Sequence, residues 1–220
     1  MASKSATDVK RILALAVGLL IVKVTVEVML GYTNYFPPDF SSDFLRGRAD
    51  YFFGPYQWAF YAHIVSGPPA LFLGLLLLGD QFRNRFPKWH RNLGRLHTLN
   101  VLCVLLPSGL CMAPYSVPGR SSAISFVVLS VLTGLFIAHG WRAAVRRQFA
   151  VHRRWMCRSF VLLCSAVVLR LLGGAGVTMS IHASEFYIAT SWASWLLPWA
   201  IFELWNMRSK FRFGRLVREE

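Results

Sequence analysis

The sequence predicts an all-α integral membrane protein, a single domain of residues 1–220 in which six transmembrane helices form a bundle. Three observations lead to this fold class. The chain is 55% hydrophobic, which is more apolar surface than a soluble domain of this length needs. Long apolar stretches recur along it, and its Lys and Arg residues gather in alternate segments between them. That charge pattern also predicts that both termini lie in the cytoplasm.

Six stretches are long enough to cross a bilayer, because a hydrocarbon core about 30 Å thick takes roughly 20 residues of helix. We expect the helices at residues 12–30, 58–78, 96–113, 122–141, 155–172 and 186–204. The outer segment between the first two, residues 31–57, is rich in Tyr and Phe and fits an aromatic belt with a short interfacial helix. Residues 207–220 are expected to form a basic cytoplasmic tail on anionic headgroups.

The basic residues set the predicted orientation. Eighteen of the 24 Lys and Arg residues lie on one side of the bundle, in the N-terminal segment, the second and fourth connections and the tail. Only Arg46, Arg48 and Arg120 lie on the other side. Cytoplasmic loops carry such an excess, so we expect this side of the protein to face the cytoplasm. The net charge of +14 is thereby explained, and we expect no nucleic-acid partner.

Charged residues within the predicted spans need a partner or a role, because each costs at least about 2.5 kcal/mol in a bilayer. Their depths predict two ion pairs. Glu27 is expected to meet Arg170 near the outer side, and Glu203 is expected to meet Arg158 near the inner side. Lys23 lies one turn before Glu27 and is placed to share its carboxylate. The pairs either fix helix packing alone or mark a functional site, and both alternatives stay open.

The second span contains two prolines, in "HIVSGPPALFLG". Proline has no backbone N–H, so the carbonyls of Ile64 and Val65 lose their helical partners. We expect a kink there, with the freed carbonyls bonded to another donor or to water.

Four histidines near the inner surface are the candidate ligands of a cofactor. A b-type haem needs two axial ligands from different helices at one depth, with Arg or Lys near its propionates. The four give two candidate pairs, His97 with His139 and His90 with His152. A quinone is the other candidate cofactor. The plain alternative is that these histidines are interfacial side chains bonded to backbone or headgroups.

The stretch "PKWHRNLGRLH" belongs to the cytoplasmic edge and carries a candidate anion site. Arg91 and Arg95 lie one turn apart with Gly94 beside them, which suits a propionate, a phosphate or a quinone carbonyl. His90 and His97 are two turns apart and are expected to share one helix face.

His63 lies near the outer surface, too far from the inner group to share a haem with it. Its candidate partners there are His182 and Met112. Gly67 follows His63 by one turn, which lets either a flat ring system or another helix approach closely.

Three segments together carry a resemblance: "HIVSGPPALFLG", "RNRFPKWHRNLGRLH" and "VHRRWMCRSFVLLCSAVVLRL", with a weaker match at "WNM". In these segments the chain resembles a bacterial family of small multi-pass predicted membrane proteins, defined as a domain of unknown function. The likeness covers about residues 61–207. It implies architecture more than activity, since the family has no settled function.

The resemblance also implies which polar residues recur. They fall on His63, Gly67, His90, Arg91, Gly94, Arg95, His152, Trp155, Arg158 and Arg170. A tyrosine is more usual at His97, and His139 is not part of the pattern, so the resemblance favours His63, His90 and His152, with His90 and His152 as the candidate ligands of haem iron. It also implies the bacterial cytoplasmic membrane as the location. The layout is also loosely similar to transmembrane b-type cytochromes of the ascorbate and ferric reductase kind, which use histidine pairs at two depths.

Three functions are therefore weighed. The first is a membrane redox protein, a candidate oxidoreductase, that binds haem b or a quinone at the inner His and Arg residues with a second site at His63. The second is a transporter or lipid-binding protein, although no inverted repeat is visible. The third is a non-catalytic membrane subunit that meets lipid or a protein partner through Trp192, Trp195 and Trp199, which share one helix face.

Overall fold

The computed structural model describes residues 2–116, 119–181 and 183–216. Side chains are described for residues 8 and 9 and within residues 11–207. In this part of the chain the secondary structure is helical and contains no strand, so the predicted all-α fold class is confirmed. The chain divides into two compact units, Met1–Cys111 and Met112–Glu220, and each is described by itself. The predicted single domain stays a prediction.

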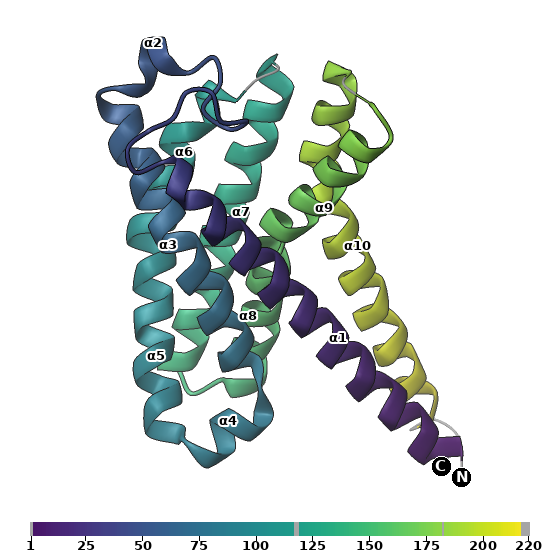
Figure 1. Cartoon of the computed structure of the whole chain (residues 1–220). Helices are drawn as coiled ribbons and strands as arrows, with labels where there is room; N and C mark the ends of the chain where they lie inside the picture. Colours follow the sequence, from purple (N-terminus) through teal and green to yellow (C-terminus); the bar gives the residue numbers. More distant parts are fainter. Residues whose placement is uncertain (1, 117–118, 182, 217–220) are drawn as a thin grey trace. The chain divides into compact units, whose positions relative to one another are not determined.

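The first unit is built on α1, on α3 and on a run of helix that begins with α5 (Figure 1). Its elements are α1 (Ala2–Leu30), η1 (Gly31–Asn34), α2 (Ala49–Phe52), α3 (Pro55–Leu78), α4 (Asp80–Arg85), α5 (Pro87–Asn100), η2 (Val101–Leu105) and α6 (Leu106–Met112). α3 packs against α1, α5 and η2. Pro55 and Pro87 begin α3 and α5, a position where the missing N–H breaks no helical hydrogen bond.

The third span differs from its predicted bounds. α5, η2 and α6 follow one another without a gap and form one candidate span, Pro87–Tyr115. The helix begins at Pro87, before the predicted start at residue 96, because hydropathy locates only the apolar part of a helix. η2 is a turn of π-helix, in which one extra residue is inserted. Such turns are frequent at functional sites.

α3 runs through both of its prolines as one helix. The carbonyl oxygen of Ile64, which Pro68 leaves without a helical donor, accepts a hydrogen bond from Tyr32 Oη at 2.8 Å. Nearby, Asn100 Nδ2 donates to the carbonyl of Ser66 at 2.9 Å. The predicted need for an outside donor is therefore confirmed at Ile64, and η1 and α5 supply side chains that tie α3 in place.

Residues 31–54 form an aromatic cap, which includes the short helix α2. Phe52 is fully buried within it. Arg48 donates from Nε to the carbonyl of Phe44 and lies 4.7 Å above the centre of that ring. Ser41 donates its hydroxyl and its backbone N–H to Asp39, and these bonds hold the pKa of that carboxyl below its usual value. The cap is thus held by rings and by local polar bonds.

The second unit is built on a helical hairpin and a third long helix. Its elements are η3 (Ala113–Tyr115), α7 (Gly119–Val145), α8 (Phe149–Leu163), α9 (Ser165–Thr178) and α10 (Ser184–Leu216). α7 packs against α8, and α10 packs against α7, α8 and α9. The stretch predicted at 155–172 lies within one candidate span, Phe149–Thr178, in which a break at Cys164 separates α8 from α9. No proline or glycine marks that break in the sequence.

Serines and tryptophans join α7 to α10. Trp192 Nε1 donates to Ser121 Oγ at 3.1 Å, and Trp195 Nε1 donates to Ser125 Oγ at 2.9 Å. Ser125 in turn donates to the carbonyl of Ser191 at 3.0 Å. The tryptophan face that was expected to meet lipid or a partner subunit therefore packs within this unit, which corrects that expectation.

Five helical runs are long and apolar enough to cross a membrane. They are Arg11–Asn34, Pro55–Leu78, Pro87–Tyr115, Gly119–Val145 and Phe149–Thr178. The multi-pass helical membrane architecture predicted from the sequence is confirmed. α10 contains the sixth predicted stretch and continues past residue 204, but it is not among these runs in the described part of the chain. The sixth span and the side on which the termini lie stay predictions.

Candidate functional site

Two histidines lie on the hairpin of α7 and α8. At Gly140 the two helices come so close that a Cβ would lie 2.7 Å from Met156 Sδ. Nδ1 of His152 lies 2.9 Å from the carbonyl oxygen of Gly140. A carbonyl oxygen only accepts, so Nδ1 carries the proton and donates it. The ring of His152 is half-buried.

His139 has the same bonding on the other helix of the hairpin. Its Nδ1 lies 2.7 Å from the carbonyl oxygen of Leu135 and must donate to it. The ring lies 5.1 Å, centre to centre, from the ring of Trp155 on α8. In both histidines, Nε2 therefore keeps its lone pair when the ring is neutral.

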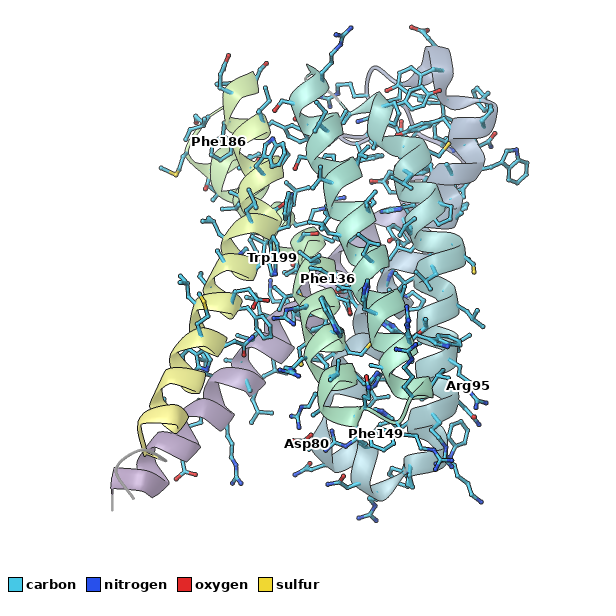
Figure 2. All side chains as sticks on the ribbon, turned by 180° about the vertical axis from the view of Figure 1, so that it is seen from behind. Asp80, Arg95, Phe136, Phe149, Phe186 and Trp199 are labelled. Carbon is cyan, nitrogen blue, oxygen red and sulfur yellow. The ribbon has the colours of Figure 1, made fainter. Side chains whose placement is uncertain are left out.

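Aromatic rings extend from this hairpin to α10. Phe136 lies 5.3 Å from Trp155 and 5.9 Å from Trp199 between ring centres, and Figure 2 shows Phe136 and Trp199 beside one another. The guanidinium of Arg158 lies 4.9 Å above the Trp155 ring. The hairpin histidines thus border a wall of aromatic side chains.

The predicted ion pair of Arg158 and Glu203 is present in the structure. Nε and Nη2 of Arg158 donate to the two carboxylate oxygens of Glu203 at 2.5 and 2.9 Å. About a quarter of each side chain is exposed, 23% and 27%. The two parallel bonds join α8 to α10 and satisfy two charges inside the second unit.

Glu27 forms a different pair from the one expected first. Lys23 Nζ lies 2.6 Å from Glu27 Oε1, one turn away on α1, as the spacing allowed. Arg170 is exposed and belongs to the second unit. The pairing of Glu27 with Arg170 stays a prediction.

In the first unit, His63 lies in a short chain of hydrogen bonds. Ser108 Oγ donates to the carbonyl of Leu105 at 2.9 Å, so its oxygen accepts from Nδ1 of His63 at 3.3 Å. His63 therefore also presents Nε2 with its lone pair. A Cβ at Gly67, one turn along α3, would meet nothing within 4 Å, so no other side chain fills that position.

The face of α5 carries the other two candidate histidines. His90, Gly94 and His97 lie on one side of the helix, as the spacing predicts. His97 is 2% exposed, and its Nδ1 is buried with no hydrogen-bond partner among the described residues. A Cβ at Gly94 would meet nothing within 4 Å. Arg91 and Arg95 are exposed beside this face, and Figure 2 shows Arg95 pointing outward.

Some predicted pairings stay predictions. His90 and His97 belong to the first unit, whereas His139 and His152 belong to the second. His182 lies outside the described residues. Within the part of the chain that the structure describes, no group of three or more His, Cys, Asp or Glu side chains is placed to hold a metal ion.

Comparison with known proteins identifies the family. The family model of predicted membrane proteins designated DUF2306 matches residues 60–206. The chain belongs to this family. No curated protein and no solved structure matches it. The expected relationship is thereby confirmed, and the matched region contains every histidine named above.

Several site residues were missed by sequence reasoning. Ser108, which fixes the ring of His63, and Gly140, which accepts from His152, carry no motif of their own. The signal for Phe136 was present, since it lies one turn before Gly140 on the same apolar helix. Only the packing of α7 on α8 shows that these residues surround the histidines.

Proposed function

We propose that this protein is a membrane redox protein that holds haem b at the α7–α8 hairpin, with His139 and His152 as the iron ligands. One observation carries the proposal, namely that Nδ1 of both rings donates to a backbone carbonyl. Haem histidines bind iron through Nε2, and a bond from Nδ1 to a carbonyl fixes the ring and makes it a better ligand.

The surroundings fit a haem group. Trp155 and Phe136 offer an apolar wall for the macrocycle. Arg142 is exposed and follows His139 by three residues, and Arg153 follows His152 directly, so each histidine has a cation near it in the chain, as haem propionates require. When bound, the haem supplies one-electron redox chemistry, and the protein positions it and sets its polarity.

The same bonding favours haem over a quinone at this hairpin. A neutral ring whose Nδ1 donates elsewhere offers only an acceptor at Nε2. The carbonyl oxygens of an oxidised quinone are also acceptors, so the two cannot form a hydrogen bond. A metal ion, in contrast, needs the lone pair that Nε2 presents.

The experiment measures haem content by pyridine haemochrome assay in protein expressed with haem supply. His139→Ala and His152→Ala are each expected to lose the haem. His97→Asn is the matched control and is expected to keep the haem, because Nδ1 of His97 does not donate to a backbone carbonyl. If His90→Ala loses the haem while His139→Ala keeps it, the pair expected from the sequence replaces the one proposed here.

We also propose that the basic turn of α4 and α5 rests on anionic headgroups, with the protein in the bacterial cytoplasmic membrane. Phe86 and Trp89 are 44% and 62% exposed there, beside the exposed Arg91 and Arg95. Exposed rings among cations suit the boundary between acyl chains and phosphates. The test compares the wild type with the Arg91→Gln, Arg95→Gln double variant. It measures the binding of each protein to vesicles with and without anionic lipid.

A further inference from the structure

His97 on α5 is a buried side chain with an unsatisfied polar atom. It is 2% exposed, and no described residue bonds to its buried Nδ1. Leaving such a group unpaired costs about 1–3 kcal/mol, so native proteins almost always supply a partner. The structure thus points to a hydrogen-bond partner that lies outside the described residues.

The face of α5 that carries His97 has an opening at Gly94. By the 100° turn of a helix per residue, His90, Gly94 and His97 fall within about 60° of one another around α5. A Cβ at Gly94 would meet nothing within 4 Å, so at this position the backbone can be approached closely. The π-turn η2 begins four residues after His97, at Val101, which is 1% exposed. A flat group can therefore lie against α5 between the two histidines.

His97 differs from the hairpin histidines in the bonding of its Nδ1 atom. In His139 and His152, Nδ1 is already bonded to a carbonyl of the chain, which leaves Nε2 as a ligand atom. In His97, Nδ1 has no partner among the described residues, and a neutral ring that carries its proton on Nδ1 needs an acceptor oxygen there. A ligand that brings its own carbonyl oxygen satisfies it.

We propose that this face of α5 binds the ring of a membrane quinone, with one quinone carbonyl accepting a hydrogen bond from Nδ1 of His97 and the ring lying over Gly94. A quinone ring is flat and apolar, carries acceptor oxygens at opposite ends, and reaches such a site from the bilayer. The proposal deepens the haem-binding function, because it names a class of partner that exchanges electrons with the haem. Only this electron exchange rests on the proposed function.

Phospholipid ester carbonyls offer the same acceptor chemistry, so the experiment separates the two sources. The affinity of a short-chain benzoquinone is measured by titration calorimetry on the purified protein in detergent. Native mass spectrometry of the same samples records the retained phospholipid. Haem content is measured in parallel, so that a failure of the haem proposal is seen independently of quinone binding.

Two variants and a matched control test the site. His97→Phe removes the donor and is expected to weaken quinone binding about tenfold, the loss typical of one hydrogen bond. Gly94→Leu fills the opening and is expected to abolish binding. Gly173→Leu, at a glycine of α9 with equally open surroundings, is expected to bind as the wild type does.

The proposal is overturned if the Gly94→Leu variant, with the same elution volume and melting temperature as the wild type, binds the benzoquinone with unchanged affinity. It is also overturned if the wild type shows no benzoquinone binding while His97→Phe loses a retained phospholipid. If the variants that lose quinone binding keep the haem content of the wild type, the two groups bind at separate sites.

Discussion

At the scale of single residues, the second unit is marked by one paired charge inside a span. Arg158 offers two parallel donors to Glu203, and its face lies over Trp155. A charge without a partner in a membrane interior is far more costly than a pair, so each member depends on the other. The pair therefore stabilises the packing of α8 against α10, whether or not the protein carries electrons.

Removing one member of this pair is expected to destabilise the protein. Arg158→Met leaves the Glu203 carboxylate without its two donors, and we expect a loss of about 3 kcal/mol, at the lower end for buried pairs because both groups are partly exposed. Thermal unfolding in detergent measures it. Arg158→Met combined with Glu203→Met is expected to recover much of the loss.

The exposed pair of Arg46 and Asp43 serves as the matched control. These side chains are 71% and 102% exposed, and their atoms lie 3.4 Å apart. Arg46→Met is expected to change the stability by less than about 1 kcal/mol. Equal losses at the two sites would show that Arg158 and Glu203 do not depend on one another.

At the scale of helices, the prolines of α3 explain why a tyrosine reaches into the span. The Tyr32 hydroxyl replaces the donor that Pro68 removes from the Ile64 carbonyl. In a bilayer, where water does not supply the missing bond, such a replacement fixes α3 against η1.

A double-mutant cycle tests this compensation. Tyr32→Phe is expected to cost about 1 kcal/mol, the usual value for one hydrogen bond within a membrane. In the Pro68→Ala background the helix supplies its own N–H to Ile64, so the same change is expected to cost much less. Unfolding by a denaturing detergent measures the four proteins, and an equal cost in both backgrounds contradicts the assignment.

α9 and α10 are held close by a glycine. A Cβ at Gly176 would overlap the ring of Phe186, at Cε1, so this ring or the helices must shift to accept a larger residue. Gly176→Ala is expected to lower the stability by about 1–3 kcal/mol, as overpacking does. Gly173→Ala, on the same helix with nothing within 4 Å, is the control and is expected to be neutral or slightly stabilising. Melting temperatures compare the two, and equal shifts would contradict this packing.

The elements also show what the sequence could predict. Hydropathy located all five helical runs that are long and apolar enough to cross a membrane, since apolar length is a property of the chain alone. It did not predict the start at Pro87 or the break at Cys164, because the first depends on where backbone bonding begins and the second on how α8 and α9 pack. The pairing of Arg158 with Glu203 was predictable from depth. The proton positions of His139 and His152 were not, since they depend on which carbonyl each ring meets.

At the scale of the whole molecule, the distribution of basic residues and the number of spans decide which side each end faces. Six crossings place both termini in the cytoplasm, whereas five place them on opposite sides. α10 is long enough to cross, with 33 residues, but serine, threonine and tryptophan lower its apolar character. Because its serines and tryptophans pack on α7, we expect it to cross within the protein.

Reporter fusions test this topology. A fluorescent protein that matures only in the cytoplasm, fused after Glu220, is expected to fluoresce. Alkaline phosphatase, which is active only outside, is expected to be active when inserted between α9 and α10. Phosphatase activity at the C-terminus would instead show that α10 does not cross.

We propose that the protein holds haem b, and a reduced-minus-oxidised absorption spectrum is the direct test. The detergent-purified protein, expressed with haem supply, is recorded oxidised and then reduced with dithionite. We predict a sharp α band and a shifted Soret band in the difference spectrum, both lost in His152→Ala. A flat difference spectrum, from protein that also yields no extractable haem, would contradict the account.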